Sequence, residues 1–290
     1  MKKVLFVGGH GMLGRPVVRH LVKEGFTVRA LARDKAKAER LLSGEVECVQ
    51  GDLENIESLR RAAEDMEAVY LNLETPDPKA PFRPDLDGSR NVVAALRERP
   101  DVVIAKISGL GLRHTDGWWP SSDLKFEAEE LIKASGHPYL FFHPTWFMES
   151  LPLLIRGKRA TLFGRKWYPK YWIAGDDYAK MVAQAFAKDV QNRTFVVQGP
   201  EALDYDEALS RFIALYSPGV KVAHVPLLVL QALGVFVPVA KDFHRLFHIA
   251  ATEKEELQSR QTWDELYQPQ MKIEDYCEYI KATGDIPKKG

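Results

Sequence analysis

Hydrophobic and polar residues follow two alternating patterns over the first half of the chain. Short apolar runs, typical of strands covered on both faces in a parallel sheet, alternate with segments whose apolar residues recur at helical spacing. The alternation predicts a doubly wound α/β sheet with right-handed crossovers. The predicted strands are residues 3–7, 27–32, 45–50, 68–73, 102–107 and 139–143, and the predicted helices are a segment ending near Gly25 and residues 36–42, 56–63, 88–97 and 123–134.

The pattern becomes less regular after Pro144. A basic turn or hairpin is expected at residues 156–164, and a strand–helix–strand pattern over residues 171–198 is expected to return to the sheet. From Glu201 onward the residues predict mainly helices, with one short strand near 220–224.

Two parts of the chain follow from these patterns. Residues 1–150 are expected to carry the sheet, and residues 151–290 to form a smaller, mostly helical lobe. Open α/β sheets bind ligands beyond the carboxyl ends of their strands. We therefore expect the lobe to cover that edge and to contribute to a substrate site.

A glycine-rich turn follows the first predicted strand and opens the first helix. Gly8, Gly11 and Gly14 form a GxxGxxG series. A tight turn is expected at Gly8, a side chain at Gly11 would obstruct a pyrophosphate, and Gly14 permits close packing of helix and sheet. Amide groups and the positive end of the helix dipole would hold the phosphates. Residues 1–150 are therefore predicted to be an NAD(P)-binding Rossmann domain, with contacts from Gly8, His10, Gly11, Met12, Leu13 and Gly14.

The end of the second strand predicts which dinucleotide binds. An acidic residue at this point would bind the ribose 2′-hydroxyl of NAD(H), but the position holds Ala32 and is followed by Arg33. A guanidinium can form charge-assisted bonds to the 2′-phosphate of NADP(H). In the alternative, Arg33 is a solvated surface residue and Asp34 binds the ribose. We expect NADP(H) as the preferred cofactor, with NAD(H) possible.

These motifs together resemble the atypical short-chain dehydrogenase/reductases, especially the NmrA-like branch. The resemblance rests on the glycine turn and on the segment Val28–Asp34, "VRALARD". It continues through Gly51-Asp52-Leu53, residues 135–150 ("SGHPYLFFHPTWFMES") and the later segment Gly175–Ala179. The order of these motifs is more specific than any one of them, and it covers residues 1–200 better than the remainder.

The resemblance also implies roles for individual residues along the cofactor. Asp52 and Leu53 would meet the adenine ring, and Asn72 and Leu73 would line the middle of the dinucleotide. Ser108 matches a serine that is frequent at the end of the fifth strand. The remaining implied residues are Pro144 and Phe147, which would border the nicotinamide.

One departure from the family concerns the catalytic pair. Classical members use a Tyr-x-x-x-Lys pair, in which the tyrosine transfers a proton and the lysine lowers its pKa. Lys125 aligns with the lysine, but Ser121 stands where the tyrosine is expected. A serine hydroxyl is a poor proton donor near neutral pH. Lys125 is expected to orient the nicotinamide ribose, or alternatively to form an i,i+4 surface pair with Glu129.

Other residues are candidates for the missing proton and for a substrate pocket. His10, His114 and His143 are predicted near the carboxyl edge of the sheet, and imidazole titrates in a useful range. The predicted catalytic set is Lys125, Ser121 and His114. One further group could form the aromatic wall of a pocket or belong to the ordinary core: Trp118, Trp119, Trp146, Phe147 and Met148. A basic group could bind an acidic substrate or form a solvated turn: Lys158, Arg159, Arg165, Lys166 and Lys170, interleaved with Phe163, Trp167 and Tyr168.

Composition narrows the possible partners. The 40 basic and 40 acidic residues give a net charge of zero, which provides no long-range field to attract nucleic acid. Cys48 and Cys277 are isolated, so neither a disulfide nor a metal site is predicted. The first apolar run is too short for a signal peptide. Prolines interrupt the longest one, residues 225–240, so we expect no membrane span and a cytoplasmic protein.

Three functions are consistent with these residues. The first is an oxidoreductase that passes a hydride from NADP(H) to a small carbonyl or quinone acceptor, apolar or aromatic in character. The second is a catalytically silent, NmrA-like redox sensor with a protein partner. The third is a cofactor-bound structural subunit of a larger assembly, with residues 227–239 as the contact.

Overall fold

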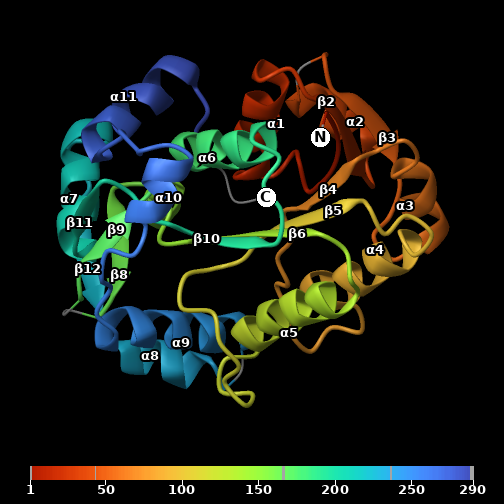
Figure 1. Cartoon of the computed structure of the whole chain (residues 1–290). Coiled ribbons are helices and arrows are strands. Elements are labelled where there is room, and N and C mark those ends of the chain that lie inside the picture. The colour runs from red at the N-terminus through yellow and green to blue at the C-terminus, as the bar shows by residue number, and fades with distance from the viewer. Residues whose placement is uncertain (1, 43, 165–166, 236, 288–290) are drawn as a thin grey trace. The chain divides into compact units, whose positions relative to one another are not determined.

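The computed structural model describes residues 2–42, 44–164, 167–235 and 237–287. The chain divides into two compact units (Figure 1). The sheet unit comprises Met1–His143 and Tyr178–Val196, and the C-terminal unit comprises Pro144–Asp177 and Val197–Gly290.

A seven-stranded sheet forms the centre of the sheet unit, as the apolar runs predicted. Every pair from β1 to β6 is parallel, so the carboxyl ends of these strands meet at one edge. The strand order is β10-β6-β5-β4-β1-β2-β3, with β1 (Lys3–Val7), β2 (Thr27–Ala32), β3 (Glu47–Gln50), β4 (Ala68–Leu71), β5 (Val103–Ile107), β6 (Tyr139–Pro144) and β10 (Arg193–Val197).

Helices cover both faces of this sheet because its strands are apolar on both faces. On one face Val69, Ile104 and Phe141 pack against α3, α4 and α5, and on the other Phe6, Tyr70 and Phe142 pack toward α1 and α6 (Figure 1). The helices are α1 (Gly14–Lys23), α2 (Lys35–Leu41), α3 (Ile56–Ala62), α4 (Ser89–Ala95), α5 (Pro120–Ala134) and α6 (Gly175–Ala187), with a short π-helical segment at Pro84–Gly88 before α4.

The C-terminal unit is built around a second, largely aromatic core. Trp172 and Tyr205 lie at its centre, with ring centroids 4.9 Å apart, and Trp146 and Phe247 pack against them. Short 3₁₀ turns occupy Met148–Ser150 and Pro152–Leu154. The strands are β7 (Ile155–Arg156), β8 (Arg159–Phe163), β9 (Lys170–Trp172), β11 (Glu201–Leu203) and β12 (Lys221–Val225), and the helices are α7 (Tyr205–Tyr216), α8 (Leu227–Leu233), α9 (Pro238–Thr252), α10 (Arg260–Glu265) and α11 (Ile273–Thr283).

The strands of the C-terminal unit correct one sequence prediction. Within residues 171–198, β10 joins the main sheet, whereas β9 pairs antiparallel with β11 in a sheet of its own. The predicted basic hairpin is present as β7 and β8, and β12 extends it as a parallel third strand. The apolar pattern of a short strand does not specify its partner, so this difference arises from tertiary packing.

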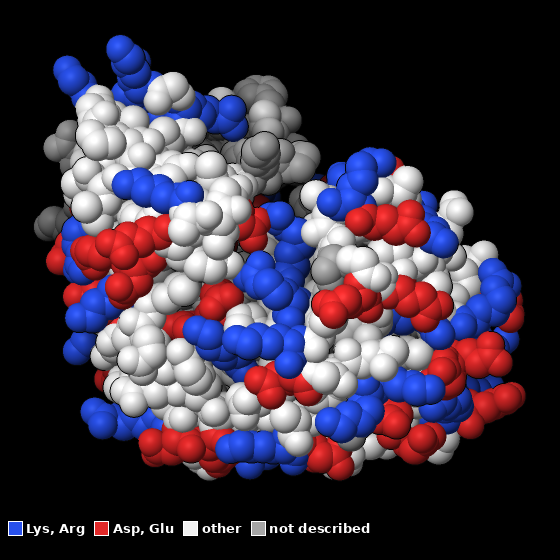
Figure 2. Space-filling view, turned by 90° about the horizontal axis from the view of Figure 1, so that it is seen from above, with Lys and Arg blue, Asp and Glu red and all other residues white. Residues whose placement is uncertain are grey.

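Surface features add two observations. No helix within the described ranges is long and apolar enough to cross a membrane. On the face seen in Figure 2, basic and acidic side chains are interspersed over much of the surface, in line with the net charge of zero.

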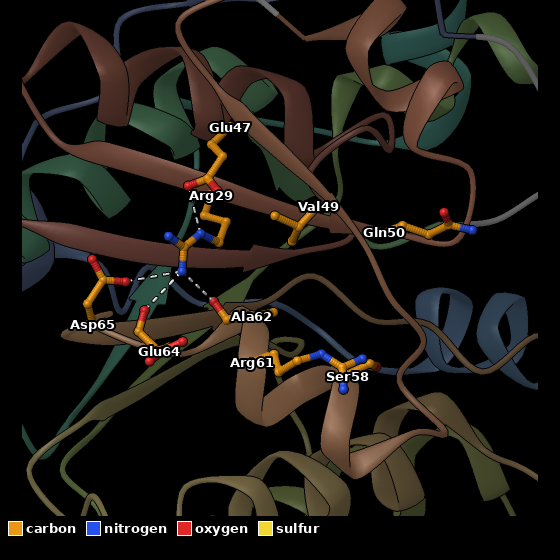
Figure 3. A pocket seen from close by; sticks show the side chains of 9 residues that line it. All are labelled: Arg29, Glu47, Val49, Gln50, Ser58, Arg61, Ala62, Glu64 and Asp65. Atoms are coloured by element: carbon orange, nitrogen blue, oxygen red, sulfur yellow. Dashed lines mark hydrogen bonds and ion pairs between the residues drawn. The ribbon is translucent and has the colours of Figure 1, made fainter.

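Arg29 on β2 connects the sheet to the end of α3. Its guanidinium lies 2.7 Å from Glu47 and 3.1 Å from Asp65, and it donates to the carbonyl oxygens of Ala62 and Glu64 (Figure 3). The last carbonyl groups of a helix have no partner within the helix. Arg29 supplies that partner and adds two carboxylate contacts.

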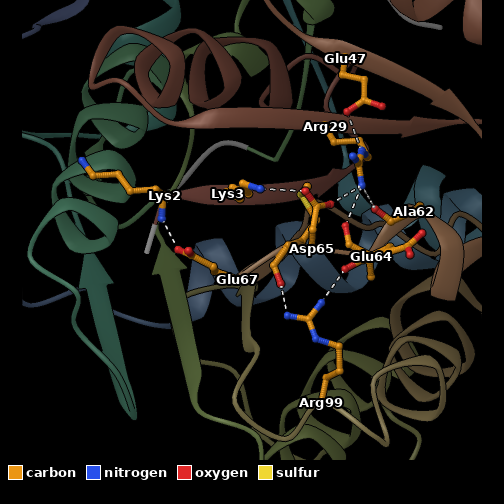
Figure 4. A network of polar contacts seen from close by, with 11 residues as sticks. Lys2, Lys3, Arg29, Glu47, Ala62, Glu64, Asp65, Glu67 and Arg99 are labelled. Carbon is orange, nitrogen blue, oxygen red and sulfur yellow. Dashed lines mark hydrogen bonds and ion pairs between the residues drawn. The ribbon is translucent and has the colours of Figure 1, made fainter.

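A second arginine completes this network. Arg99 donates to the carbonyl oxygens of Ala63 and Met66, at 2.9 and 2.7 Å (Figure 4). A surface pocket of ≈ 560 Å³ is lined by Arg29 and Arg61, but the Nε and Nη1 groups of Arg29 already bind protein carboxylate and carbonyl oxygens (Figure 3). We assign this pocket a structural origin and place the functional site elsewhere.

Glu149 is an unusual buried carboxyl in the C-terminal unit. Its Oε1 accepts a hydrogen bond from the Gly175 amide at 2.9 Å, while its Oε2 is buried with no hydrogen-bond partner among the described residues. Burial raises the pKa of Glu149 to about 7, against the amide bonds that lower it, and the charges of Asp285 and Asp176 add to the increase.

Glu149→Gln is expected to remove a pH dependence of stability. Because the folded-state pKa lies above that of an exposed glutamate, the wild-type contribution is complete below about pH 4.5 and is lost as the pH rises through about 7. The pKa shift corresponds to about 3 kcal/mol of stability. The free energy of unfolding of the variant should therefore exceed that of the wild type most at pH 8. Urea denaturation at pH 5 and pH 8 measures this difference.

The control for this prediction is Glu98→Gln, which makes the same change at an exposed glutamate. In this control, the difference in the free energy of unfolding between pH 5 and pH 8 should be the same as in the wild type. An identical slope of stability against pH in the wild type and in Glu149→Gln would contradict the prediction.

Candidate functional site

The glycine turn between β1 and α1 is held by close backbone packing. Gly8 has φ +83°, and a Cβ there would lie 2.3 Å from the carbonyl oxygen of Asn72. A Cβ at Gly14 would lie 2.3 Å from the carbonyl oxygen of Gly8. Gly11 differs, since its Cβ would lie 3.2 Å from Gly8 O and 3.5 Å from the Asn72 amide nitrogen. The fold therefore demands glycine at positions 8 and 14, whereas a Cβ at position 11 would require only a shift of a few tenths of an ångström.

The start of α1 is suited to bind an anion. Leu13 occupies the N-cap position without a side-chain hydrogen bond, and the first turn contains no acidic residue. The amide of Gly11 donates to Gly8 O at 3.1 Å, which closes the turn. An uncapped helix start presents amide groups and a partial positive charge to a phosphate. The turn fits the pyrophosphate of a dinucleotide.

Basic side chains gather beside this turn. Burial lowers the pKa of His10, and the positive charges of Lys37 and Arg33 lower it further. Arg33 is exposed at the end of β2. Asp34, the alternative ribose ligand, accepts a hydrogen bond from the Lys37 amide at 2.9 Å and caps α2. The charge of Asp34 opposes these effects on His10, and the net direction remains a lowered pKa.

The residues predicted to meet adenine lie after β3. Asp52 accepts a hydrogen bond from the Ser58 hydroxyl at 2.9 Å through its carbonyl group, which fixes the loop on α3. Leu53 packs closely on Gly88, where a Cβ would lie 2.2 Å from its side chain, and its carbonyl oxygen accepts from Asn91. These contacts connect the loop after β3 to α3 and to the segment that leads into α4.

Asn72 and Leu73 connect the glycine turn to the far end of the site. The Asn72 side-chain amide donates to Gly8 O at 3.2 Å. The next carbonyl, Leu73 O, accepts a hydrogen bond from Lys125 Nζ at 3.3 Å. Gly8, Asn72, Leu73 and Lys125 therefore form one continuous chain of contacts along the carboxyl edge of the sheet.

Lys125 is paired with a buried carboxylate that the sequence did not suggest. Asp85 Oδ1 lies 3.0 Å from Lys125 Nζ and 2.7 Å from Lys106 Nζ, while Oδ2 accepts from the Thr75 hydroxyl at 2.9 Å. Lys106 is fully buried and Asp85 is 1% exposed. Burial alone favours a neutral Asp85, but the two lysines lower its pKa well below the ordinary value. Burial lowers the pKa of Lys106, while Asp85 opposes that effect.

The predicted surface pair between Lys125 and Glu129 is replaced by other contacts. Glu129 is buried and lies 2.8 Å from Nε2 of His143. Burial alone would raise the pKa of Glu129, but the hydrogen bond and charge of His143 lower it, as do nearby Ser108 and Lys106. The Ser108 hydroxyl is buried close to this carboxylate, without a hydrogen bond of normal geometry in the described structure. Two ionic clusters therefore lie between α5 and the ends of β5 and β6.

The other two residues of the predicted catalytic set have different surroundings from Lys125. His114 lies 3.1 Å from Asp116 and 3.8 Å from Glu127, on the exposed side of α5. Ser121 lies in the first turn of α5 and is partly buried. The neighbouring Trp118 is 45% exposed. The ammonium group of Lys125 instead contacts Asp85 and the carbonyl oxygen of Leu73.

Several residues predicted to line a pocket or the nicotinamide lie in the C-terminal unit, and two of them, Trp146 and Met148, belong to its core. Met148 is 1% exposed, and Trp146 packs on Tyr205 at 5.2 Å between ring centroids. Pro144 ends β6, and Phe147 forms an isolated bridge with Ile173. Trp146 and Met148 therefore belong to the core, as the alternative interpretation expected, whereas Trp118 is 45% exposed.

The basic cluster is only partly as predicted. Lys170 is 6% exposed and donates to the carbonyl oxygen of Glu253 at 2.6 Å, so it is not a solvated cation. Phe163 and Trp167 pack on the core, whereas Tyr168 is 44% exposed. Lys158 and Arg159 are exposed, and the predicted members Arg165 and Lys166 lie outside the described residues.

Sequence reasoning missed Asp85, Lys106 and Thr75. One signal was available, because Lys106 is a lysine within the otherwise apolar strand Val103–Ile107. A buried strand rarely contains a charge without a partner. Its partner, 21 residues earlier, has no local pattern that marks it.

The geometry defines a nucleotide-binding protein of the Rossmann class. A family model described as NAD(P)H-binding matches residues 8–189. This span exceeds half of the 290 residues, and the chain belongs to this NAD(P)H-binding family. The predicted resemblance, the Rossmann-type fold and a nicotinamide dinucleotide as cofactor are thereby confirmed.

Individual relatives and solved structures extend this result. The chain is 28% identical over 267 residues to the NAD(P)H azoreductase of Xenophilus azovorans, and the aligned region covers 85% of this chain and 87% of the relative. It is 25% identical over 237 residues to the photosystem II assembly factor Ycf39 of Cyanophora paradoxa, covering 79% and 73%. The NADPH complex of an Escherichia coli NADPH-dependent quinone oxidoreductase shares the fold, with a TM-score of 0.75, 19% identity and coverage of 96% and 99%.

Proposed function

We propose that this protein is an NADP(H)-dependent reductase of small apolar or aromatic acceptors, such as azo compounds, quinones and carbonyl compounds. The observation that carries the proposal is the continuous chain of contacts from the glycine turn through Asn72 and Leu73 to Lys125. It connects the start of α1, after β1, to a cation beside the end of the neighbouring strand β4. The azoreductase and quinone oxidoreductase relatives support this class of acceptor.

In this proposal, each group of residues along the carboxyl edge of the sheet has one role. The α1 start and Gly11 bind the pyrophosphate, and Arg33, with Lys37 nearby, binds the 2′-phosphate. Lys125, fixed by Asp85, orients the nicotinamide ribose. The bound dinucleotide supplies a hydride to the acceptor, and the protein positions the acceptor and excludes water.

Arg33→Glu is expected to reverse the preference for the phosphorylated cofactor. With a quinone or azo acceptor, the wild type should oxidise NADPH faster than NADH. The variant should raise the Kd for NADPH by about 10-fold or more, because a carboxylate then faces the 2′-phosphate, and should change the Kd for NADH by less than about 3-fold. Calorimetry and initial rates with both cofactors measure the effect.

Lys35→Glu is the matched control for this prediction. It makes the same charge change two residues away, where Lys35 pairs with Glu39 on α2 at 3.6 Å. The control should change both affinities by similar, small factors. An equal loss of NADPH and NADH affinity in Arg33→Glu would refute the assignment of Arg33.

A second candidate function is a cofactor-binding assembly or regulatory protein. The observation in its favour is an apolar surface on and after α8, where Leu228 is 71%, Leu233 48% and Val235 76% exposed. The Ycf39 relative is an assembly factor, and Ser121 replaces a catalytic tyrosine. A protein of this kind would bind NADPH and NADP⁺ and would oxidise NADPH with none of the acceptors tested.

A further inference from the structure

The pair formed by His143 and Glu129 lies where β6 reaches the carboxyl edge of the sheet. His143 Nε2 is 2.8 Å from Glu129 Oε1, and the side chains are 16% and 5% exposed. The preceding residues of β6, Leu140 to Phe142, are fully buried. His143 is therefore the first side chain after the buried part of β6 that reaches accessible space.

The neighbours of this pair belong to the proposed site. The Ser108 amide donates to Phe142 O at 2.8 Å, which extends the β5–β6 ladder and sets Ser108 beside His143. Glu129 lies one helical turn after Lys125 on α5. The pair shares this part of the sheet edge with the cation assigned to the nicotinamide ribose.

The hydrogen bonding of His143 leaves one ring nitrogen available. Glu129 remains anionic despite its burial, because His143, Ser108 and Lys106 lower its pKa. This carboxylate fixes the imidazole through Nε2. Nδ1 forms no hydrogen bond with the residues that the structure describes. The side chain as a whole is 16% exposed. An imidazole held by a carboxylate at one nitrogen, with the other nitrogen not engaged by the described part of the protein, is the arrangement of a general acid or base.

We infer that His143 donates the proton in the proposed reduction, and that Glu129 is its positioning residue. The inference rests on the proposed function. The acceptor gains a hydride, with its electron pair, from the reduced dinucleotide, and the Nδ1–H bond of the imidazolium breaks so that its proton joins the acceptor's oxygen or nitrogen. NADPH is oxidised and the acceptor is reduced by two electrons. The neutral ring keeps its Nε2–H bond to Glu129 and regains a proton from water.

The need for a proton from His143 differs between classes of acceptor. An azo or carbonyl compound becomes a strongly basic nitrogen or oxygen anion if no proton arrives with the hydride. A quinone becomes a phenolate, whose conjugate acid has a pKa of about 10 by analogy with tyrosine. Reduction of azo and carbonyl compounds therefore depends on His143, whereas reduction of quinones depends on it weakly.

The experiment compares His143→Arg and His143→Gln with the wild type. Arginine retains a pair with Glu129 but keeps its proton, and glutamine removes the charge. Both variants should lower kcat by about 100-fold or more with an azo dye or an aromatic aldehyde, and by less than about 3-fold with benzoquinone. Their Kd for NADPH should remain within about 3-fold of the wild type.

A second histidine–carboxylate pair provides the control. His224 Nε2 lies 2.5 Å from Asp206 Oδ1 on the surface of the C-terminal unit. His224→Arg and His224→Gln should leave the ratio of azo to quinone rates unchanged. This pair matches the chemistry of the substitution without a role in the proposed site.

An NMR measurement tests Glu129 without relying on turnover. In wild-type protein labelled with ¹⁵N-histidine, the His143 signals should show a protonated Nε2, and Glu129→Gln should change this pattern. Equal losses with azo and quinone acceptors, or no loss with either, would overturn the proton-donor role alone. A wild-type protein that binds NADPH but reduces no acceptor would overturn the reductase proposal and this inference together.

Discussion

Gly11→Ala is expected to weaken NADPH binding by about 100-fold or more while the protein remains folded. A Cβ at this position requires the turn to yield by only a few tenths of an ångström, because Gly8 O lies 3.2 Å from it and the Asn72 amide nitrogen 3.5 Å. The methyl group would occupy the space from which the pyrophosphate approaches the amides of α1. Calorimetry with NADPH and thermal unfolding measure the two effects separately.

Substitutions at two other glycines test whether the effect on NADPH binding is separate from an effect on stability. Gly14→Ala should lose stability as well as binding, because its Cβ would lie 2.3 Å from a backbone oxygen. Gly44→Ala should change neither, since nothing lies within 4 Å of its Cβ. If Gly11→Ala binds NADPH as tightly as the wild type, the pyrophosphate does not pass over this turn.

Asp85→Asn is expected to lower the free energy of unfolding by about 3–5 kcal/mol. The substitution keeps the shape of the side chain but removes the only charge that faces both Lys106 and Lys125 in the described structure. Lys106 is fully buried, so its ammonium group would lose the carboxylate that lies 2.7 Å away and retain only the more distant charge of Glu129. Urea denaturation at neutral pH measures the loss.

A double-mutant cycle distinguishes this pair from a general weakness of the core. Lys106→Met fills a similar volume without a charge, so Asp85→Asn combined with Lys106→Met should recover at least about 2 kcal/mol relative to the sum of the single losses. Additive losses would show that the two residues stabilise the fold independently. Lys125, which is 22% exposed, can move toward solvent in the variant.

The sequence by itself determined the framework and the cofactor end of the site. The apolar runs that form β1 to β6 and the glycine turn are local features, since a strand–turn–helix unit is specified by residues adjacent in the chain. The same holds for Arg33, whose place after β2 follows from the length of that strand. Apart from β1, these features lie within residues 8–189, which match the family model.

The tertiary structure alone decided the partners of the buried charges and of the short strands. Asp85 pairs with lysines that are 21 and 40 residues away. Glu129 pairs with His143 rather than with Lys125, its neighbour on the helix. β9 paired with β11 rather than with the sheet. The physical reason is the same in each case: a buried charge or a strand edge must find a complementary group, and many segments carry one. Only the packed chain determines which of them comes within hydrogen-bond distance.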